Sequence, residues 1–271
     1  LKIPLPFPPL PRASPARPAR RAGWAMPLDH GEGQALRHGE PAAQGEEAEA
    51  SQEEVQREAW RSAEAAYTSL PGCETLEILG QPVMESWEAP YMAALAAAAC
   101  APGGRVLEVG FGLGLSAGYV DAYEQVEEHV IFEANDAVLG RAALWADTAR
   151  RPTTVFGGFW QELVGDFADG SFGGVLFDAF PLSPAEAAGD GEVGEFFASA
   201  ARLLRPGGHF AFYYDFGANW IECVRAFRAD TVPKLLRAGF SSVEEDQVPC
   251  TPRKGCTYFW KDRFLVPCAV R

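Results

Sequence analysis

The chain has 271 residues, 48% of them hydrophobic and 22% charged, which is enough for one sizeable α/β domain with extra segments. Its formal net charge is -14 and its pI is near 4.8. Nucleic acids and anionic membranes bind basic faces, so this balance argues against both as partners and favours a small or cationic molecule.

The cysteines and histidines form no recognisable metal or disulfide pattern. Six cysteines are scattered without a Cys-x-x-Cys pair, and the four histidines are spread along the chain. We therefore expect no metal site, no disulfide framework and a reducing compartment. No apolar run approaches the length that crosses a bilayer, so a cytoplasmic location is expected.

Residues 1–50 are predicted not to fold. Residues 1–21 are rich in proline, alanine and arginine and contain no acid, which resembles the basic part of an organelle transit peptide. A leader without a targeting role, with Met26 as a candidate start, is the alternative. Residues 31–54 are too polar to bury a core. We expect a leader or transit segment over 1–50, which leaves organellar import open, and one folded domain over 51–271.

A helix is predicted to begin near Glu53 and to run through Trp60 to Tyr67. The spacing of Trp60 and Tyr67 puts both rings on one helical face. Such a helix either docks on the domain as ordinary packing or covers the ligand as a lid.

A second helical face is predicted at residues 84–92. Met84, Glu88 and Met92 follow i, i+4, i+8 spacing, although Pro90 limits the regularity of the helix. A methionine stripe is normally packing filler, but a carboxylate between two methionines is unusual in a plain core. A buried Glu88 would need a cationic partner, which a guanidinium group supplies.

The most informative stretch is residues 105–115. A short apolar run ends in Gly110, Gly112 and Gly114, which predicts a buried parallel strand, a glycine-rich turn and a helix. Such turns serve several kinds of nucleotide. Glu108, inside the strand end, would repel a pyrophosphate. It disfavours a nicotinamide-dependent oxidoreductase and favours a ligand with a cationic head, such as S-adenosylmethionine.

Glu133 supplies a second carboxylate at the end of the next strand, residues 130–133. It follows the glycine turn by roughly 20 residues, where an acid accepts both hydroxyls of a ribose. The alternative is that Glu133 only caps the following helix through Asn135 and Asp136.

Helices and strands alternate through the rest of the chain. Helices are predicted over 115–123, 136–145, 192–204 and 221–238 and at residues 157–162, strands over 153–156, 174–178 and 209–214, and an antiparallel edge pair over 243–248 and 257–266. Phe159 or Trp160 either stacks near an adenine or belongs to the core, and Asp178 points at the ligand crevice. The predicted fold class is α/β: a doubly wound, mostly parallel seven-stranded sheet with a C-terminal antiparallel strand pair and an N-terminal helical lid.

These motifs carry a resemblance to a known family. Residues 108–114, Glu133 and the turn at residues 203–208 resemble a class I S-adenosylmethionine methyltransferase. Residues 78–92 are similar to the matching stretch of the guanidinoacetate N-methyltransferase family, and the similarity runs from about Ala59 to the C-terminus.

The resemblance, together with the motifs above, implies the site residues. It implies that Glu88 and Asp178 hold a guanidino group, with Trp60 beside them. The candidate cofactor-binding residues are Trp60, Met84, Met92, Glu108, Gly110, Phe111, Gly112, Leu113, Gly114, Leu115, Glu133, Ala134, Asn135, Trp160, Gln161 and Asp178.

The sequence departs from the family in two places. Asp215 and Phe216 stand where the family binds the substrate carboxylate through the backbone of a Leu-Thr pair, so both are candidate substrate-binding residues. The added carboxylate of Asp215 could repel guanidinoacetate. Ala179 replaces a threonine that follows the catalytic Asp in the family.

The expected function is S-adenosylmethionine-dependent N-methylation of a guanidino group, from guanidinoacetate to creatine. Asp178 is expected to accept the proton and Glu88 to orient the substrate, both remaining ionised. Arginine or another guanidino compound is the alternative substrate, and a non-catalytic S-adenosylmethionine-binding protein is the alternative class. The partner is expected to be a small guanidino molecule, and the protein a monomer or homodimer.

Overall fold

The computed structural model describes residues 43–183, 186 and 191–271, which leaves most of the predicted leader outside the described residues. The compact unit begins at Gln44. Its first element, α1 (Ala43–Ser62), begins earlier than the expected start near Glu53 and ends before Tyr67. Tyr67 lies in a strand, so the prediction that Trp60 and Tyr67 share a helical face is wrong.

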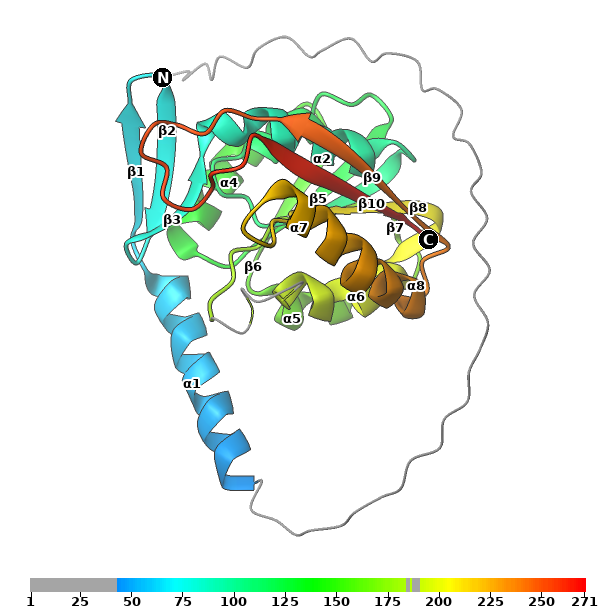
Figure 1. Ribbon diagram of the computed structural model, residues 1–271, viewed down its shortest axis with the longest axis horizontal. Coiled ribbons are helices and arrows are strands. Elements are labelled where there is room, and N and C mark those ends of the chain that lie inside the picture. Colours follow the sequence, from blue (N-terminus) through cyan, green and yellow to red (C-terminus); the bar gives the residue numbers. More distant parts are fainter. Residues whose placement is uncertain (1–42, 184–185, 187–190) are drawn as a thin grey trace. The chain divides into compact units, whose positions relative to one another are not determined.

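A three-stranded antiparallel sheet that the sequence did not predict follows α1 (Figure 1). Its strands are β1 (Ala65–Leu70), β2 (Cys73–Ile78) and β3 (Gln81–Glu85). Leu79 and Gly80 have φ angles of 51° and 72°, as a type I′ hairpin turn between β2 and β3 requires. The sheet buries Leu76 and Ile78 against the rest of the domain.

Met84 belongs to β3, so the predicted helical face of Met84, Glu88 and Met92 is wrong. A 3-10 turn (Ser86–Glu88) follows β3, and Pro90 stands in the first turn of α2 (Ala89–Cys100). Proline is favoured there because the first amide groups of a helix have no partner within it. The hairpin and the proline together place the three side chains on three different elements.

The main sheet has seven strands in the order β6-β5-β4-β7-β8-β10-β9, which confirms the predicted fold class (Figure 1). Five strands are parallel, and β10 is antiparallel to both of its neighbours. The strands are β4 (Gly104–Val109), β5 (Val126–Glu133), β6 (Thr153–Gly157), β7 (Phe172–Phe177), β8 (Leu204–Phe212), β9 (Ser242–Pro249) and β10 (Arg263–Val270). The strand expected over 257–266 begins only at Arg263, so residues 257–262 are free to reach the site.

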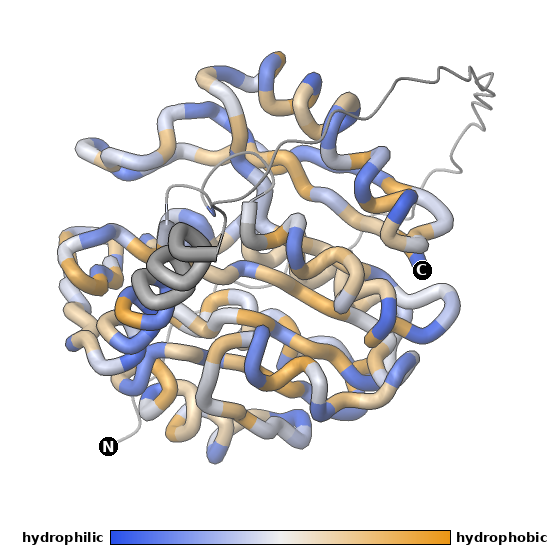
Figure 2. The backbone as a smooth tube through the Cα atoms, turned by 90° about the horizontal axis from the view of Figure 1, so that it is seen from below, coloured by the Kyte–Doolittle hydropathy of each residue, from blue (hydrophilic) through white to orange (hydrophobic). Residues whose placement is uncertain are grey.

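Helices cover both faces of this sheet. Val106 of β4 belongs to the apolar cluster that includes α2, α3 (Leu115–Val120) and α4 (Asp136–Ala146). The next residue, Leu107, belongs to the cluster with α6 (Gly191–Leu203) and α8 (Val232–Ala238). Successive side chains of a strand point to opposite faces, which explains why these strands are hydrophobic without alternation. Figure 2 shows the hydrophobic stretches running along the central strands.

Short helices complete the fold. α5 (Trp160–Leu163) and a 3-10 turn (Val164–Asp166) follow β6. The single helix expected over 221–238 is instead α7 (Trp220–Ala226), a π-helical turn (Phe227–Thr231) and α8, because Pro233 in the first turn of α8 lacks a donor for a continuous ladder. Within the described residues, no helix has both the length and the apolar character needed to span a bilayer.

Candidate active site

A cavity of about 390 Å³ lies at the carboxyl ends of the parallel strands, where ligands of open α/β sheets bind. Residues at or just after the ends of β4, β5, β7 and β8 line its floor, including Gly110, Glu133, Asp178 and Asp215. The wall is formed by Trp60 of α1, by β2 and β3, and by residues 158–160 and 178–181. The unpredicted N-terminal sheet is therefore part of the site.

The loop after β4 requires glycine at positions 110 and 112. Gly110 has φ +91°, and a Cβ there would lie 2.3 Å from the carbonyl oxygen of Asp178. Gly112 has φ +55°, and its Cβ would lie 3.1 Å from Met84 Sδ. Gly110 and Gly112 both line the cavity, so a ligand can lie directly against the backbone.

Glu133 lies beside this loop and accepts hydrogen bonds from the backbone. Oε2 accepts a hydrogen bond from the Phe111 N–H at 2.9 Å, and Oε1 accepts one from the Asn135 N–H at 2.8 Å. Burial raises the pKa of this carboxyl, and these backbone donors oppose the rise. Glu133 also lines the cavity, so the same oxygens lie within reach of ligand hydroxyls.

Asn135 is not a cavity residue but fastens the wall. Its side-chain oxygen caps α4, and Nδ2 donates to the carbonyl oxygens of Trp60 (2.8 Å) and Ala63 (2.9 Å). Trp60 lines the cavity and stacks on Phe180 at 4.9 Å between ring centroids. Asn135 therefore acts on the site by holding the end of α1 that carries Trp60.

Glu108 does not line the cavity, contrary to the prediction that it faces the head group of the ligand. Glu108 is fully buried and accepts a hydrogen bond from Ser116 Oγ. Its Oε2 lies 2.8 Å from His129 Nε2, but the angle between the two groups is too poor for a hydrogen bond. Strand alternation and the crossover to α3 turn it away from the ligand side. Its charge still reaches the site, because it helps to raise the pKa of Asp178.

Other predicted cofactor residues divide between the lining and the core. Ala134, Trp160 and Met84 line the cavity. Met92 is completely buried in α2 and does not line the cavity. Leu113 does not line it either, and its N–H donates to Met84 Sδ at 3.4 Å. The remaining predicted residues outside the lining are Phe111, Gly114, Leu115 and Gln161 near the cofactor end, and Phe216 near the substrate end.

Glu88 and Asp178, the predicted guanidino ligands, both line the cavity. Glu88 is 3% exposed, and its Oε1 accepts the Glu85 N–H at 2.8 Å and the Tyr258 hydroxyl at 2.7 Å. The first of these bonds is the return half of a capping box at the start of the 3-10 turn. Oε2 receives no hydrogen bond from a described residue, so it is available to a ligand.

Both carboxyls are harder to ionise than expected. Burial raises the pKa of Glu88 to about 8. The two hydrogen bonds oppose this rise, and the charges of Asp178 and Glu85 add smaller increases. Burial and then the charge of Glu108 raise the pKa of Asp178 to about 7. In the ligand-free site no basic side chain lines the described cavity to stabilise their charges, so the ionised pair that the sequence predicts requires a bound cation.

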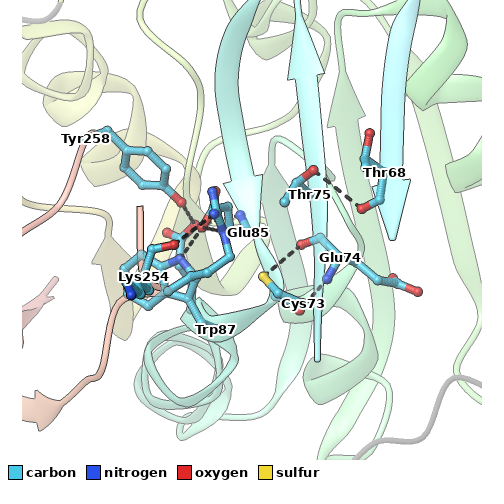
Figure 3. Close-up of polar contacts among 11 residues, drawn as sticks. Thr68, Cys73, Glu74, Thr75, Glu85, Trp87, Lys254 and Tyr258 are labelled. Carbon is cyan, nitrogen blue, oxygen red and sulfur yellow. Dashed lines mark hydrogen bonds and ion pairs between the residues drawn. The ribbon is translucent and has the colours of Figure 1, made fainter. Parts of the chain in front are cut away.

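The segment before β10 supplies residues that the sequence did not single out. Arg253 forms a two-pronged ion pair with Glu85, at 2.6 Å (Nη2–Oε1) and 3.1 Å (Nε–Oε2), and Trp87 Nε1 donates to Glu85 Oε2 at 2.6 Å. Tyr258, from the same segment, reaches Glu88. In Figure 3 the Tyr258 hydroxyl points toward the group of side chains that contains Glu85 and Trp87, which come from a distant part of the sequence. These contacts fix Glu88 from the opposite end of the chain.

Asp215 lines the cavity, and its Oδ1 pairs with Lys261 Nζ at 2.5 Å. Lys261 is 7% exposed and was not predicted. Burial raises the pKa of Asp215, and the hydrogen bond and charge of Lys261 oppose the rise. The acid that replaces the family's Leu-Thr pair therefore faces the ligand with a buried countercharge behind it.

The lining fits S-adenosylmethionine. Trp60, Phe159 and Trp160 offer apolar and aromatic surface for an adenine. Glu133 presents a carboxylate at the place where an acid accepts ribose hydroxyls, and the glycine backbone admits close approach. The acidic lining suits a ligand with a cationic head. Among the described residues, no group of three or more metal-binding side chains is found.

Comparison with known proteins agrees with this geometry. The model of the guanidinoacetate N-methyltransferase family matches residues 48–271. Two curated relatives, both named protein arginine N-methyltransferase 2, come from Aspergillus oryzae and Emericella nidulans; they are 30% identical over 169 and 172 residues, or 61% and 62% of this chain. The chain spans only 39% of the length of each relative.

Solved structures resemble the fold. A spermidine synthase in complex with the transition-state analogue AdoDATO has a TM-score of 0.57 at 14% identity, covering 77% of this chain and 68% of that chain. The spermidine synthase of Thermotoga maritima gives 0.55 at 14% identity, covering 77% and 69%. At such low identity the likeness shows the shared α/β fold.

Proposed function

The chain belongs to the guanidinoacetate N-methyltransferase family and is an S-adenosylmethionine-dependent methyltransferase, and from this premise we propose that it methylates a nitrogen of a guanidino group. The observation that carries the proposal is the pair Glu88 and Asp178 in a cavity that no basic residue lines within the described part of the chain. A guanidinium has a pKa of about 12 or higher, so it enters as a cation. Two carboxylates on a common cavity match its charge and its array of donors.

The raised pKa values fit this role. The carboxyls of Asp178 and Glu88, with pKa values of about 7 and about 8, are partly or largely protonated in the empty site near neutral pH. Entry of a guanidinium favours the ionised forms, because an opposite charge nearby lowers the pKa of an acid. The substrate thereby creates the carboxylate clamp that holds it, and neutral molecules of the same shape do not.

The residues divide the chemistry between them. When bound, S-adenosylmethionine supplies an electrophilic methyl group on a sulfonium; the glycine loop, Glu133 and Trp60 would hold it. Glu88 Oε2 orients the guanidino group, since Oε1 is already engaged. Asp178 accepts the proton that the nitrogen loses as it is methylated, and a base with a pKa near the working pH suits that task.

Two substrates follow from different observations. Guanidinoacetate, with creatine as its product, is the compound for which the family is named. Arginine is favoured by the position of Asp215 on the cavity. The two curated relatives are named for methylation of arginine in proteins, which supports the guanidino group as the acceptor but not a particular small molecule. We propose a small guanidino molecule as the partner in either case.

Transfer of an isotopically labelled methyl group tests the proposal. The protein is incubated with labelled S-adenosylmethionine and guanidinoacetate or arginine, and the labelled atom is located by NMR. We expect the label on a guanidino nitrogen and S-adenosylhomocysteine as the second product. Binding of S-adenosylmethionine without transfer to any guanidino compound would favour the non-catalytic alternative.

A further inference from the structure

The cavity carries more negative charge than guanidino transfer requires. Its acidic lining residues are Glu88, Glu133, Asp178 and Asp215, and no lysine, arginine or histidine lines it within the described residues. Given the guanidino chemistry proposed above, Glu88 and Asp178 are assigned to the guanidinium and Glu133 to the cofactor. Asp215 remains, at the end of β8, without a role in either.

Asp215 presents an acceptor to the cavity. Oδ1 is bonded to Lys261, while the other oxygen receives no hydrogen bond from a described residue. Lys261 itself does not line the cavity; its ammonium lies against Phe259 and Trp260, 5.5 Å and 5.3 Å from their ring centroids. A ligand therefore meets a carboxylate oxygen and not the ammonium, and this oxygen can only accept hydrogen bonds.

The backbone beside Asp215 offers little to a carboxylate. The Tyr214 N–H is taken by the Tyr91 hydroxyl at 3.1 Å, and the Ala218 N–H by Glu222 Oε2 at 2.9 Å. Burial raises the pKa of the Cys223 thiol and the Phe216 N–H opposes the rise, so this N–H points at Cys223. Three of the amide groups that follow β8 are thus engaged within the chain.

We infer that Asp215 is a specificity-determining residue, and that the substrate is a guanidino compound whose far end carries an ammonium group and not a free carboxylate alone. Guanidino-amines are the class that fits. An ammonium group of the substrate would donate to the unused oxygen of Asp215. While the site is empty, the ion pair with Lys261 reduces the free-energy cost of burying the Asp215 carboxylate. Among the described lining residues, a short guanidino acid meets four acidic side chains and no basic one.

A matched pair of substrates tests this assignment. Guanidinobutylamine and guanidinobutyrate have similar lengths but opposite charges at the far end. We expect kcat/KM of the wild type to favour the amine by roughly tenfold or more, because the carboxylate of the acid would face the carboxylate of Asp215 and leave its oxygen without a donor. Asp215→Asn should remove most of this preference. Calorimetry in the presence of S-adenosylhomocysteine should show the same change in affinity.

The controls separate specificity from folding. Asp262→Asn changes an exposed acid, 72% exposed and paired with Arg263, and should leave the preference intact. Because Asp215→Asn leaves the Lys261 ammonium buried, the double variant Asp215→Leu with Lys261→Met removes both charges together and should abolish the preference in a folded protein.

The outcomes distinguish this inference from the proposed function. Methylation of both guanidino compounds with equal efficiency, or a preference for the acid that the variants leave unchanged, would overturn the assignment of Asp215 alone. Methylation of no guanidino compound would overturn the proposed function and the assignment with it.

Discussion

The two ends of the cavity are built in different ways. Most of the cofactor end comes from one stretch of the chain, residues 110–160: the glycine loop, Glu133, and residues 158–160 after the next strand, joined by Trp60 and Met84. The substrate end brings together Glu88, Asp178, Asp215 and Tyr258 from separate segments. Tyr258 and Glu88 are 170 residues apart in the chain, and Arg253 and Glu85 are 168 apart.

The two ends therefore depend on different physical features. The cofactor end depends on backbone conformation, which a few glycines and one acid determine locally. The substrate end depends on long-range contacts that hold partly buried acids in place. Mutations at the first should affect cofactor binding and folding, whereas mutations at the second should affect the substrate.

The largest effect is expected for Asp178→Asn, which keeps the shape of the side chain but removes the proton acceptor. We expect kcat to fall by on the order of 10²-fold or more, with little change in the affinity for S-adenosylmethionine. The control is Asp169→Asn, since Asp169 is 78% exposed and paired only with Arg202. Equal kcat values in wild type and Asp178→Asn would remove Asp178 from the reaction.

Gly110→Ala should lower the free energy of unfolding, because the added methyl group does not fit into the loop at the cofactor end. Its Cβ would lie 2.3 Å from the Asp178 carbonyl oxygen, at a φ of +91°. Gly72→Ala is a matched control, because Gly72 has φ +76° but nothing within 4 Å of the added atom. The control should lose about 1 kcal/mol of stability from backbone strain, and Gly110→Ala about 2 kcal/mol more from the clash. Urea denaturation measures both; equal losses would show that the loop adjusts.

Glu133→Ala should weaken S-adenosylmethionine binding by about 2 kcal/mol, a factor of about 30. The substitution removes acceptors for ligand hydroxyls and also leaves the Phe111 and Asn135 N–H groups without their partner. KM for the guanidino substrate should change little at saturating cofactor. Unchanged calorimetric affinity in a folded variant would remove Glu133 from the cofactor site.

The smallest of these effects is expected for Tyr258→Phe. The Tyr258 hydroxyl opposes the raised pKa of Glu88, so its loss leaves the carboxyl harder to ionise. We expect KM for the guanidino substrate to rise roughly fivefold near neutral pH, the effect of one hydrogen bond, and less at higher pH where Glu88 ionises anyway. A pH-independent change would indicate lost packing instead.

The sequence predicted the parts of the fold that are locally encoded. The strand, glycine turn and helix at residues 104–120, the parallel order of the central strands and the positions of Glu133 and Asp178 follow from periodicity and from the fold class. Glu88 was singled out both by a helical face that does not form and by the family resemblance. It lines the cavity with Met84 because β3 and the 3-10 turn bring both there.

The sequence could not show contacts that depend on tertiary structure. The hairpin of β1 and β2 was missed because Pro71 and Gly72 were not read as a turn between short strands. Glu108 was assigned to the ligand from its place before the glycine turn, because the sequence does not show that His129 on the next strand lies against its carboxylate. Lys261, Arg253 and Tyr258 carry no motif; only the antiparallel return of β10 brings their segment over the site.

The claim that Glu88 and Asp178 form a clamp for a guanidinium is tested most directly by calorimetric titration of methylguanidine and methylurea into the protein saturated with S-adenosylhomocysteine. The two compounds have the same shape, lack a tail, and differ in charge. Because a bound cation lowers the pKa values of about 7 and about 8, the carboxyls must lose protons on binding, and affinity must rise with pH through this range. We predict that methylguanidine binds with release of about one proton near pH 7, measured in buffers of different ionisation enthalpy, and that methylurea does not bind. Equal binding of both compounds, or binding of methylguanidine without proton release, would contradict the clamp.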